Sequence, residues 1–232
     1  MDLLTDADLD ALRALDTPTV CNALEVVTPD RRGGGYSVQP FFCPRPELKP
    51  IVGYARTGTI RSMQPSDRSA AEDTSVRLDY YDHIASGPGP TITVIEDLDA
   101  VPGYGAWWGE VNTSIHQGLG SLGVITNGSI RDLDDAAEGF QMLAGMAGPS
   151  HAWVRVVEFG LAVTVHGMTV LPGDLVHADR HGAVVIPADA AREIPAAAAR
   201  IADAERVLIE ASRGADFSAA ELREIMGGRT GH

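Results

Sequence analysis

Three charged residues in the middle of the chain, Glu110, Arg131 and Asp132, have types and a spacing suited to metal-assisted chemistry on an anion. Asp132 can offer a hard oxygen ligand to a divalent cation, and Arg131 can hold a carboxylate through two parallel hydrogen bonds. Glu110, which residues 111–130 separate from that pair, can order a metal-bound water. Cleavage of a carbon–carbon bond beside a carbonyl needs these functions together, so the set indicates that class of reaction.

The loop before Glu110 is rich in glycine and aromatic residues over positions 102–109. Gly105 and Gly109 allow the backbone to approach a ligand closely. If a helix begins near Glu110, its first N–H groups have no intrahelical partners, and the positive end of the helix dipole helps them to bind a carboxylate. A tight turn with a capping acid explains this loop alone equally well.

A short apolar segment, residues 123–126, leads to the Arg-Asp pair through the turn Asn127-Gly128. Arg131 and Asp132 therefore follow the carboxyl end of a predicted strand, which is where open α/β sheets place their ligands. The alternative is that Asp132 caps a helix over residues 131–139 and that Arg131 pairs with an aspartate at the surface. For an isolated Arg-Asp pair this alternative would be preferred; the spacing from Glu110 and the glycine loop favour the site.

Composition excludes several classes of function. The 232 residues carry a net charge of −14, which disfavours binding to nucleic acids. Cys21 and Cys43 are the cysteines of the chain; they allow a disulfide without implying one, and cannot form a zinc site alone. The acidic start does not resemble a signal peptide, and no run of about 18 apolar residues predicts a membrane span. We expect a cytoplasmic protein.

The hydrophobic pattern predicts one α/β domain over residues 1–232, with helical arms at 1–28 and 188–232 and a strand–helix–strand–helix order typical of a βαβ unit. Thr5 or Asp6 caps the first helix, and Thr17 caps a second that begins at Pro18. Residues 29–50 form a loop long enough to suggest a role in assembly or in covering a site. The remaining predicted elements are strands at 51–62, 91–96 and 123–126, helices at 73–85, 110–118 and 131–139, five strands within 153–187, and helices at 188–213 and 218–226. The apolar positions of the helix at 73–85 are Val76, Leu78, Tyr81 and Ile84.

The spacing of the Gly-acid pair and the Arg-Asp pair resembles the aldolase branch of the RraA-like superfamily, which includes 4-hydroxy-4-methyl-2-oxoglutarate and 4-carboxy-4-hydroxy-2-oxoadipate aldolases. Three further segments carry the same resemblance, at residues 17–24, 118–132 and 170–187. Each motif is weak alone, but together they are specific. The resemblance implies an α/β fold, a swivelling β/β/α sandwich of the RraA type, assembled as a homotrimer or homohexamer.

The resemblance also implies roles for individual residues. Asp132 would be the protein ligand of Mg²⁺ or Mn²⁺, with water in most other positions. The substrate would be a small anionic 2-oxo acid whose keto oxygen or carboxylate binds Arg131. The backbone N–H groups of Gly109, Glu110, Val111 and Asn112 would hold the carboxylate. A glutamate from the C-terminal helix of a neighbouring subunit would complete the site, and Glu205 is the first candidate, with Glu210 second.

The expected reaction is retro-aldol cleavage of a 4-hydroxy-2-oxo acid, or decarboxylation of oxaloacetate, because both leave a pyruvate enolate. The alternative is a non-enzymatic binding protein that regulates a ribonuclease, as the namesake of the superfamily does. A methyltransferase is disfavoured because the chain has no glycine-rich nucleotide loop after its first strand.

Several residues depart from the pattern or stand outside it. Asn127 occupies a position where many relatives carry Asp. Trp107 and Trp108 would line the pocket and set a different substrate. His116, on the predicted helix at 110–118, is expected to pack rather than to bind a ligand. The polar group His177, Asp179, Arg180 and His181 is an ordinary polar turn, a substrate-recognition element or a second acid–base group.

Overall fold

A computed structural model describes residues 3–227 of the chain as a mixed α/β fold, which confirms the predicted class. A curled sheet has the strand order β12-β11-β1-β2-β4-β6, and β8 also pairs with β1. Its strands are β1 (Ile51–Arg61), β2 (Thr91–Asp97), β4 (Ser121–Thr126), β6 (Gln141–Leu143), β8 (Arg155–Phe159), β11 (Leu175–Asp179) and β12 (Gly182–Ile186). The smaller pairings join β3 (Ala106–Trp108), β5 (Ser129–Ile130) and β7 (Met146–Ala147), and separately β9 (Val163–Val165) and β10 (Met168–Val170).

Two strand–helix–strand crossovers join the parallel strands β1, β2 and β4. Helix α3 (Ala70–Ala85) connects the parallel strands β1 and β2, and α4 (Glu110–Gly118) lies between the parallel strands β2 and β4. The predicted βαβ arrangement is therefore confirmed. Because β2 and β4 are parallel, the chain leaves both at the same edge, where the segments before α4 and after β5 meet.

The core divides into clusters that correspond to the layers. Helices α3 and α4 cover one part of the sheet through a cluster that includes Tyr80, Trp108, Phe140 and Met142. The β9–β10 hairpin packs on the sheet through a second cluster, which includes Val165 and Met168. The third cluster joins β11 and β12 to the helical arms α1 (Asp6–Arg13), α2 (Thr17–Val27) and the start of α5 (Ile194–Ser212).

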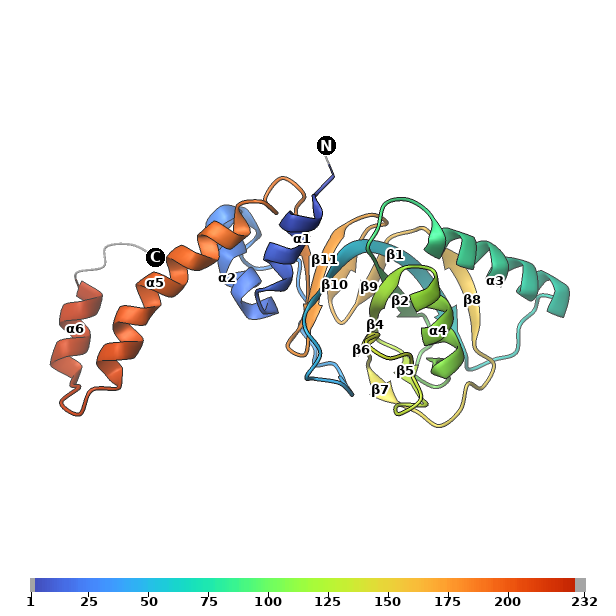
Figure 1. The fold of residues 1–232 in the computed structure, drawn as a ribbon. Coiled ribbons are helices and arrows are strands. Elements are labelled where there is room, and N and C mark those ends of the chain that lie inside the picture. Colours follow the sequence, from blue (N-terminus) through green and yellow to red (C-terminus); the bar gives the residue numbers. More distant parts are fainter. Residues whose placement is uncertain (1–2, 228–232) are drawn as a thin grey trace.

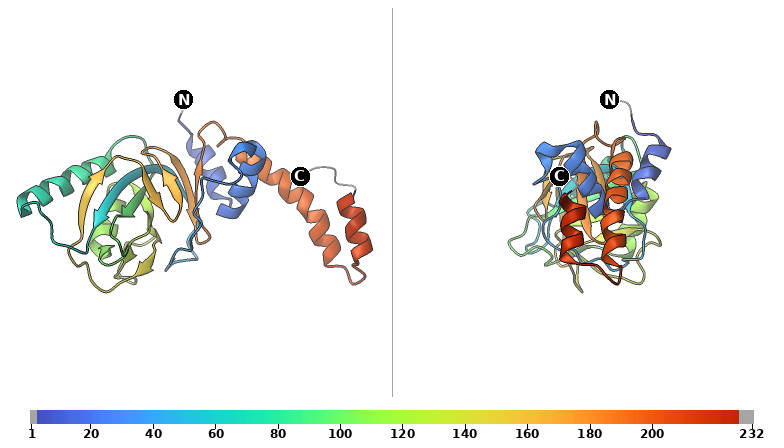
Figure 2. Two further views of the ribbon diagram at one scale, coloured as in Figure 1. Left: turned by 180° about the vertical axis from the view of Figure 1, so that it is seen from behind. Right: turned by 90° about the vertical axis from the view of Figure 1, so that its left-hand side faces the viewer.

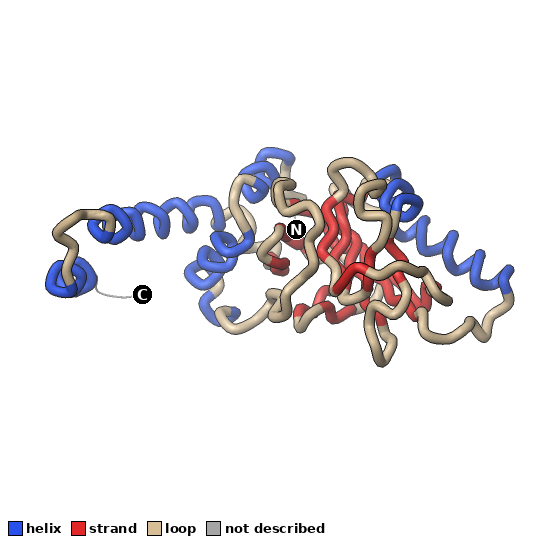
Figure 3. The backbone as a smooth tube through the Cα atoms, turned by 90° about the horizontal axis from the view of Figure 1, so that it is seen from below, coloured by secondary structure: helices blue, strands red, loops and turns tan. Residues whose placement is uncertain are grey.

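The C-terminal arm is long and only partly packed. Ile194, Ala197 and Ala198 of α5 are buried, whereas Val207 and Ile209 further along are exposed. Figures 1 and 2 show α5 projecting away from the sheet and α6 (Ala219–Gly227) folding back beside its outer end. Figure 3 shows from below that this arm and α3 lie at opposite ends of the molecule. Within residues 3–227, none of the helices has the length and apolar character needed to cross a membrane.

Several local predictions are confirmed and others are wrong. Thr5 caps α1, and Ser218 accepts a hydrogen bond from the N–H of Glu221 in the first turn of α6. The cap of α2 is Asp16 rather than Thr17, because the Asp16 carboxylate accepts the Thr19 N–H. Thr17 instead donates its own N–H to Asp179 at 2.9 Å.

Helix α3 begins at Ala70, earlier than predicted, because Ser69 and Glu72 form a capping box there. Its buried positions are Tyr80 and Ile84, whereas the predicted core residue Leu78 is 58% exposed.

The predicted helix over 131–139 is wrong, since this segment forms turns. Helix α5 begins only at Ile194, although a helix was predicted from residue 188. Residues 29–50 form a loop as predicted, apart from the short 3₁₀ turn η1 (Pro29–Arg31).

The polar group of the β11–β12 hairpin connects the N-terminal arm to the sheet. His177 is fully buried, and its Nδ1 lies 3.0 Å from the Thr17 hydroxyl. Burial acts to raise the pKa of Asp179, but hydrogen bonds from Thr17 and His181 outweigh it and leave that pKa below its usual value. His177 and Asp179 thus anchor α2 to β11, which favours the structural interpretation over substrate recognition.

Candidate functional site

The structure brings Glu110, Arg131 and Asp132 together at the edge where β3 and β5 end. These two short strands are parallel neighbours, and the Arg131 N–H donates to the Trp108 carbonyl at 2.8 Å. The chain after Trp108 enters α4, so the Glu110 N–H faces Asp132 and lies 3.4 Å from its Oδ2. Residues separated by the whole of α4 and β4 therefore share one short stretch of surface.

Asp132 adopts an uncommon backbone conformation. Its φ is +51°, in the left-handed region, which costs a residue other than glycine roughly 1 kcal/mol or more. The Asp132 carbonyl accepts the N–H groups of Asp135 and Ala136, which closes a single turn that does not continue as a helix. Such conformations persist only where surrounding contacts hold them, and they gather at functional sites.

Arg131 keeps hydrogen-bonding capacity for a ligand. Its Nη1 lies 3.4 Å from Asp132 Oδ1 and 3.3 Å from Oδ2. Among residues 3–227, its buried Nε has no acceptor. The side chains of Arg131 and Asp132 are 35% and 32% exposed, so both remain reachable from solvent. A guanidinium with spare donors beside a carboxylate suits an anion that also contacts a cation.

The first turn of α4 offers backbone donors. Gly109 is the N-cap and has no side chain to cap the helix, so the Glu110 N–H donates instead to Asp132 Oδ2. The Asn112 amide is already engaged, because Nδ2 donates to the Trp107 carbonyl at 2.6 Å and Oδ1 accepts the Tyr81 hydroxyl at 2.8 Å. Asn112 and the exposed Val111 can therefore serve a ligand through their main chain, not through hydrogen-bonding side chains.

His116 packs against the first turn of α4, which confirms its predicted packing role. It is fully buried, and its Nδ1 lies 2.6 Å from the Asn112 carbonyl, to which it must donate. Its Nε2 then accepts the hydroxyl of buried Tyr80 at 2.7 Å. Burial lowers the pKa of His116 to about 4, so the imidazole is neutral at physiological pH.

The donor set fits one kind of metal. Among residues 3–227 there is no group of three or more His, Cys, Asp or Glu side chains that could hold an ion. A zinc site is therefore not built within this part of one chain. Magnesium commonly binds through one or two carboxylates and keeps several waters, so the accessible carboxylate of Asp132 is compatible with Mg²⁺ or Mn²⁺.

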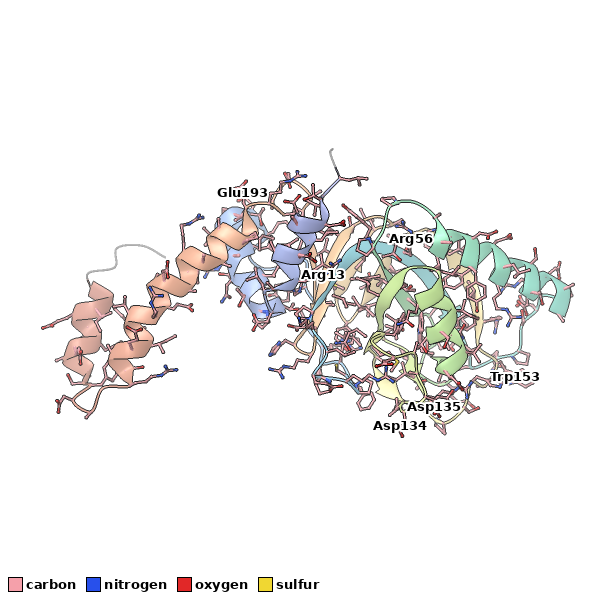
Figure 4. All side chains as sticks on the ribbon, viewed as in Figure 1. Arg13, Arg56, Asp134, Asp135, Trp153 and Glu193 are labelled. Carbon is pink, nitrogen blue, oxygen red and sulfur yellow. The ribbon has the colours of Figure 1, made fainter. Side chains whose placement is uncertain are left out.

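A cavity of about 600 Å³ adjoins Arg131 and lies between α3, the start of α4 and residues 151–156. Three arginines line it, Arg77, Arg131 and Arg155, against one carboxylate, Asp73, which is paired with Arg68 at 2.8 Å. Trp107 and Trp153 line it as well, and Figure 4 shows Trp153 on the side of the molecule away from the C-terminal arm. The cavity is thus locally positive in an acidic protein.

Some predicted residues take other places. Trp108 is fully buried in the core rather than in the cavity wall. Glu205 and Glu210 are exposed on α5, which projects away from the sheet, so their own chain does not bring them to Asp132. The sequence-based list missed Arg77, Trp153 and Arg155. Trp153 and Arg155 alternate within the strand predicted from residue 153, and this was a usable signal because it places both on one face.

Comparison with known proteins places the chain in a structural context. A family model described as RraA-like, Aldolase/RraA, matches residues 17–185. A search of curated protein sequences gave no significant match. The solved structures described below share 24% sequence identity or less with this chain, so their similarity shows the fold alone.

Three such structures are informative. An uncharacterized protein from Pseudomonas syringae pv. tomato str. DC3000 has a TM-score of 0.71 and 24% identity, with 95% of each chain covered. RraAS2 from Streptomyces coelicolor, described as an unusual member of the RNase ES inhibitor RraA protein family, has a TM-score of 0.68 and 22% identity over 89% of this chain and 98% of its own. The RNA-processing inhibitor RraA from Thermus thermophilis has a TM-score of 0.51 and 19% identity over 71% of this chain and 90% of its own.

Proposed function

Because this chain belongs to the RraA-like (Aldolase/RraA) family, we propose that it is a divalent-metal-dependent lyase that cleaves a carbon–carbon bond of a 2-oxo acid. The observation that carries the proposal is the contact of Asp132 with both the Glu110 N–H and the Arg131 guanidinium, at the first turn of α4. A carboxylate, a cation and unpaired N–H donors are the groups that such a reaction uses.

The 2-oxo acid would bind with its carboxylate at the start of α4. The N–H groups of Val111 and Asn112 are available there, and the helix dipole favours a negative charge. Arg131 would hold the keto oxygen through donors that Asp132 does not use. The rest of the substrate would extend into the cavity beside Arg131.

In the retro-aldol reaction, the substrate 4-hydroxyl loses its proton, the bond between C3 and C4 breaks, and the electron pair moves toward the keto oxygen as pyruvate enolate forms. Arg131 stabilises this developing charge more strongly in the transition state than in the ground state. Glu110 receives the hydroxyl proton, directly or through water, as C4 becomes the carbonyl of the second product. A proton from solvent then adds to C3, which gives pyruvate. Mg²⁺ or Mn²⁺ bound at Asp132 would supply Lewis-acid polarisation of the keto group.

Decarboxylation of oxaloacetate follows the same electron movement, with carbon dioxide as the leaving group. It needs no base, so Arg131 and Asp132 suffice and Glu110 does not act in the bond-breaking step. The proposed site also includes Glu205, or Glu210, of α5 from a neighbouring subunit of a trimer or hexamer. The exposure of this part of α5 supports that assignment, since the arm is available to another chain.

The second candidate is a non-enzymatic protein that binds a ribonuclease. It is favoured by the similarity to Streptomyces coelicolor RraAS2, described as belonging to an RNase ES inhibitor family. Such a binder does not need a cation-binding carboxylate at Asp132, so loss of metal-dependent chemistry in an Asp132 variant discriminates between the two candidates.

The test is release of pyruvate from oxaloacetate, and from a panel of 4-hydroxy-2-oxo acids, with Mg²⁺ and after treatment with a chelator. The lyase proposal requires turnover that depends on Mg²⁺ and that Asp132→Ala abolishes. Asp134→Ala is the matched control, because Asp134 lies in the same turn and is exposed. Full activity of Asp132→Ala without metal would refute the proposal.

A further inference from the structure

Arg45 lies in the loop between α2 and β1 and reaches the turn that follows Asp132. Its Nη1 donates to the Ala137 carbonyl at 2.7 Å. Its Nη2 donates to the Ala136 carbonyl at 2.7 Å and to the Leu133 carbonyl at 3.2 Å. One side chain thus binds three carbonyl oxygens of a single turn, for which the planar fork of a guanidinium is well suited.

The same turn is held on its other side by α4. The Ala137 N–H donates to the Thr113 hydroxyl at 2.9 Å, and the Gln117 amide donates to the Glu138 carbonyl at 2.7 Å. The turn is therefore clamped between a helix that belongs to the site and an arginine that comes from a distant loop. Asp132, at the beginning of this turn, has the left-handed backbone that needs such support.

The loop that carries Arg45 is itself fixed at the edge of the sheet. Phe42 exchanges two backbone hydrogen bonds with Ala144, at 2.7 and 3.1 Å. Cys43 lies beside Gln141 of β6, with its sulfur 3.7 Å from the amide oxygen. Arg45 therefore follows a firmly held segment, and the sheet edge fixes the guanidinium relative to the turn.

We propose that Arg45 is a positioning residue for Asp132, a proposal that rests on the proposed function of Asp132 as a metal ligand. Arg45 does not touch the ligand. It holds the carbonyls of Leu133, Ala136 and Ala137, and this keeps the Asp132 carboxylate against Gly109 and Arg131. Without it, those carbonyls lose a charged donor and the turn relaxes, so Asp132 spends less time in the geometry that binds a cation.

The test measures binding of Mn²⁺ by titration calorimetry in the full-length protein, together with the dependence of turnover on Mg²⁺. Arg45→Ala should weaken Mn²⁺ binding roughly tenfold, as loss of a supporting residue around a metal ligand typically does. At saturating Mg²⁺ its kcat should stay close to that of the unaltered chain, because Arg131 and the helix start are intact. The Mn²⁺ affinity of Arg45→Lys should lie between those of Arg45→Ala and the unaltered chain, since an ammonium cannot span all three carbonyls.

Arg32→Ala is the matched control, because Arg32 lies in the same loop but pairs at the surface with Glu25. It should bind Mn²⁺ as the unaltered chain does. Unchanged Mn²⁺ affinity in both Arg45 variants would overturn the positioning role while leaving the proposed function intact. If the unaltered chain shows no Mn²⁺ binding that Asp132→Ala removes, the proposed function fails, and the role of Arg45 falls with it.

Discussion

Gly109 and Asp132 pack so closely that a Cβ atom at Gly109 would lie 2.5 Å from Asp132 Oδ2. The backbone of Gly109 is extended, with φ of −166°, so any residue could adopt its conformation. Glycine is needed here for space alone. The contact joins the start of α4 to the proposed metal ligand, so a larger residue at position 109 would meet that carboxylate.

Gly109→Ala should displace the Asp132 carboxylate without unfolding the protein. The new methyl group meets the end of a short side chain, which can rotate away, so the cost to stability should be about 1–2 kcal/mol. Mn²⁺ affinity and pyruvate release should both fall by at least roughly tenfold. Calorimetry and a coupled assay measure these effects.

Gly118→Ala is the control for this substitution, since an added Cβ at Gly118 would meet nothing within 4 Å. It should preserve metal binding and, within a helix, stabilise slightly. Equal Mn²⁺ affinity in the Gly109 and Gly118 variants would contradict the proposed geometry.

The buried His116 predicts a component of acid sensitivity. Its folded pKa of about 4 lies below the unfolded value of about 6.5, so the unfolded state binds a proton first as the pH falls. Stability is therefore lost progressively from about pH 6.5 down to about pH 4, by up to roughly 3 kcal/mol from this group. Urea denaturation as a function of pH should show a shallower decline in His116→Gln than in the unaltered chain.

Other buried histidines act in the same direction, so the difference between the two proteins is the informative quantity. Burial also lowers the pKa of His177, and this contribution is common to both proteins. Parallel pH profiles would mean that His116 takes up its proton as easily in the folded chain as in the unfolded one.

Because Arg77 and Arg155 line the cavity beside Arg131, we expect the protein to prefer substrates with a second anionic group. Arg155→Ala and Arg77→Ala should each raise the KM for a dianionic 4-hydroxy-2-oxo acid such as 4-hydroxy-4-methyl-2-oxoglutarate, by about fivefold for a lost contact near 1 kcal/mol. The kcat should change little, since neither residue contacts the bond that breaks. A 4-hydroxy-2-oxo acid with an uncharged end serves as control, and a similar rise in its KM would show that the effect is not electrostatic.

The sequence could predict helix α4 and the parallel strand order, but not the individual contacts between residues far apart in the chain. The prediction of 110–118 coincides with α4 because Gly109 precedes it and Gly120, with φ of +91°, follows it. By contrast, Thr17 was the predicted cap of α2, but its N–H donates to Asp179, far along the chain, and Asp16 caps the helix.

The same distinction explains the outcome at the candidate site. The proximity of Glu110 to Asp132 was predictable, since parallel strands place successive chain exits at one edge. The left-handed backbone of Asp132 was not, because it depends on contacts made by Arg45 and Thr113 from other parts of the chain. A helical pattern over 131–139 was therefore overridden by tertiary hydrogen bonds.

The exposed half of α5 leads to a prediction about assembly. If Glu205 of one subunit completes the site of another, Glu205→Gln and Asp132→Asn should each be inactive alone, yet a mixture that exchanges subunits should regain activity. In a ring assembled at random from equal amounts, roughly a quarter of the sites would combine an intact Asp132 with an intact Glu205 from the adjacent subunit. Pyruvate release from a 4-hydroxy-2-oxo acid after co-refolding measures this recovery. Mixing Glu224→Gln, altered on α6, with Asp132→Asn provides the control, which should show the activity of the Glu224 variant diluted by the inactive one. If the Glu205 and Asp132 variants regain nothing on mixing, Glu205 does not act across subunits, and the same experiment with Glu210→Gln decides whether the second candidate on α5 does.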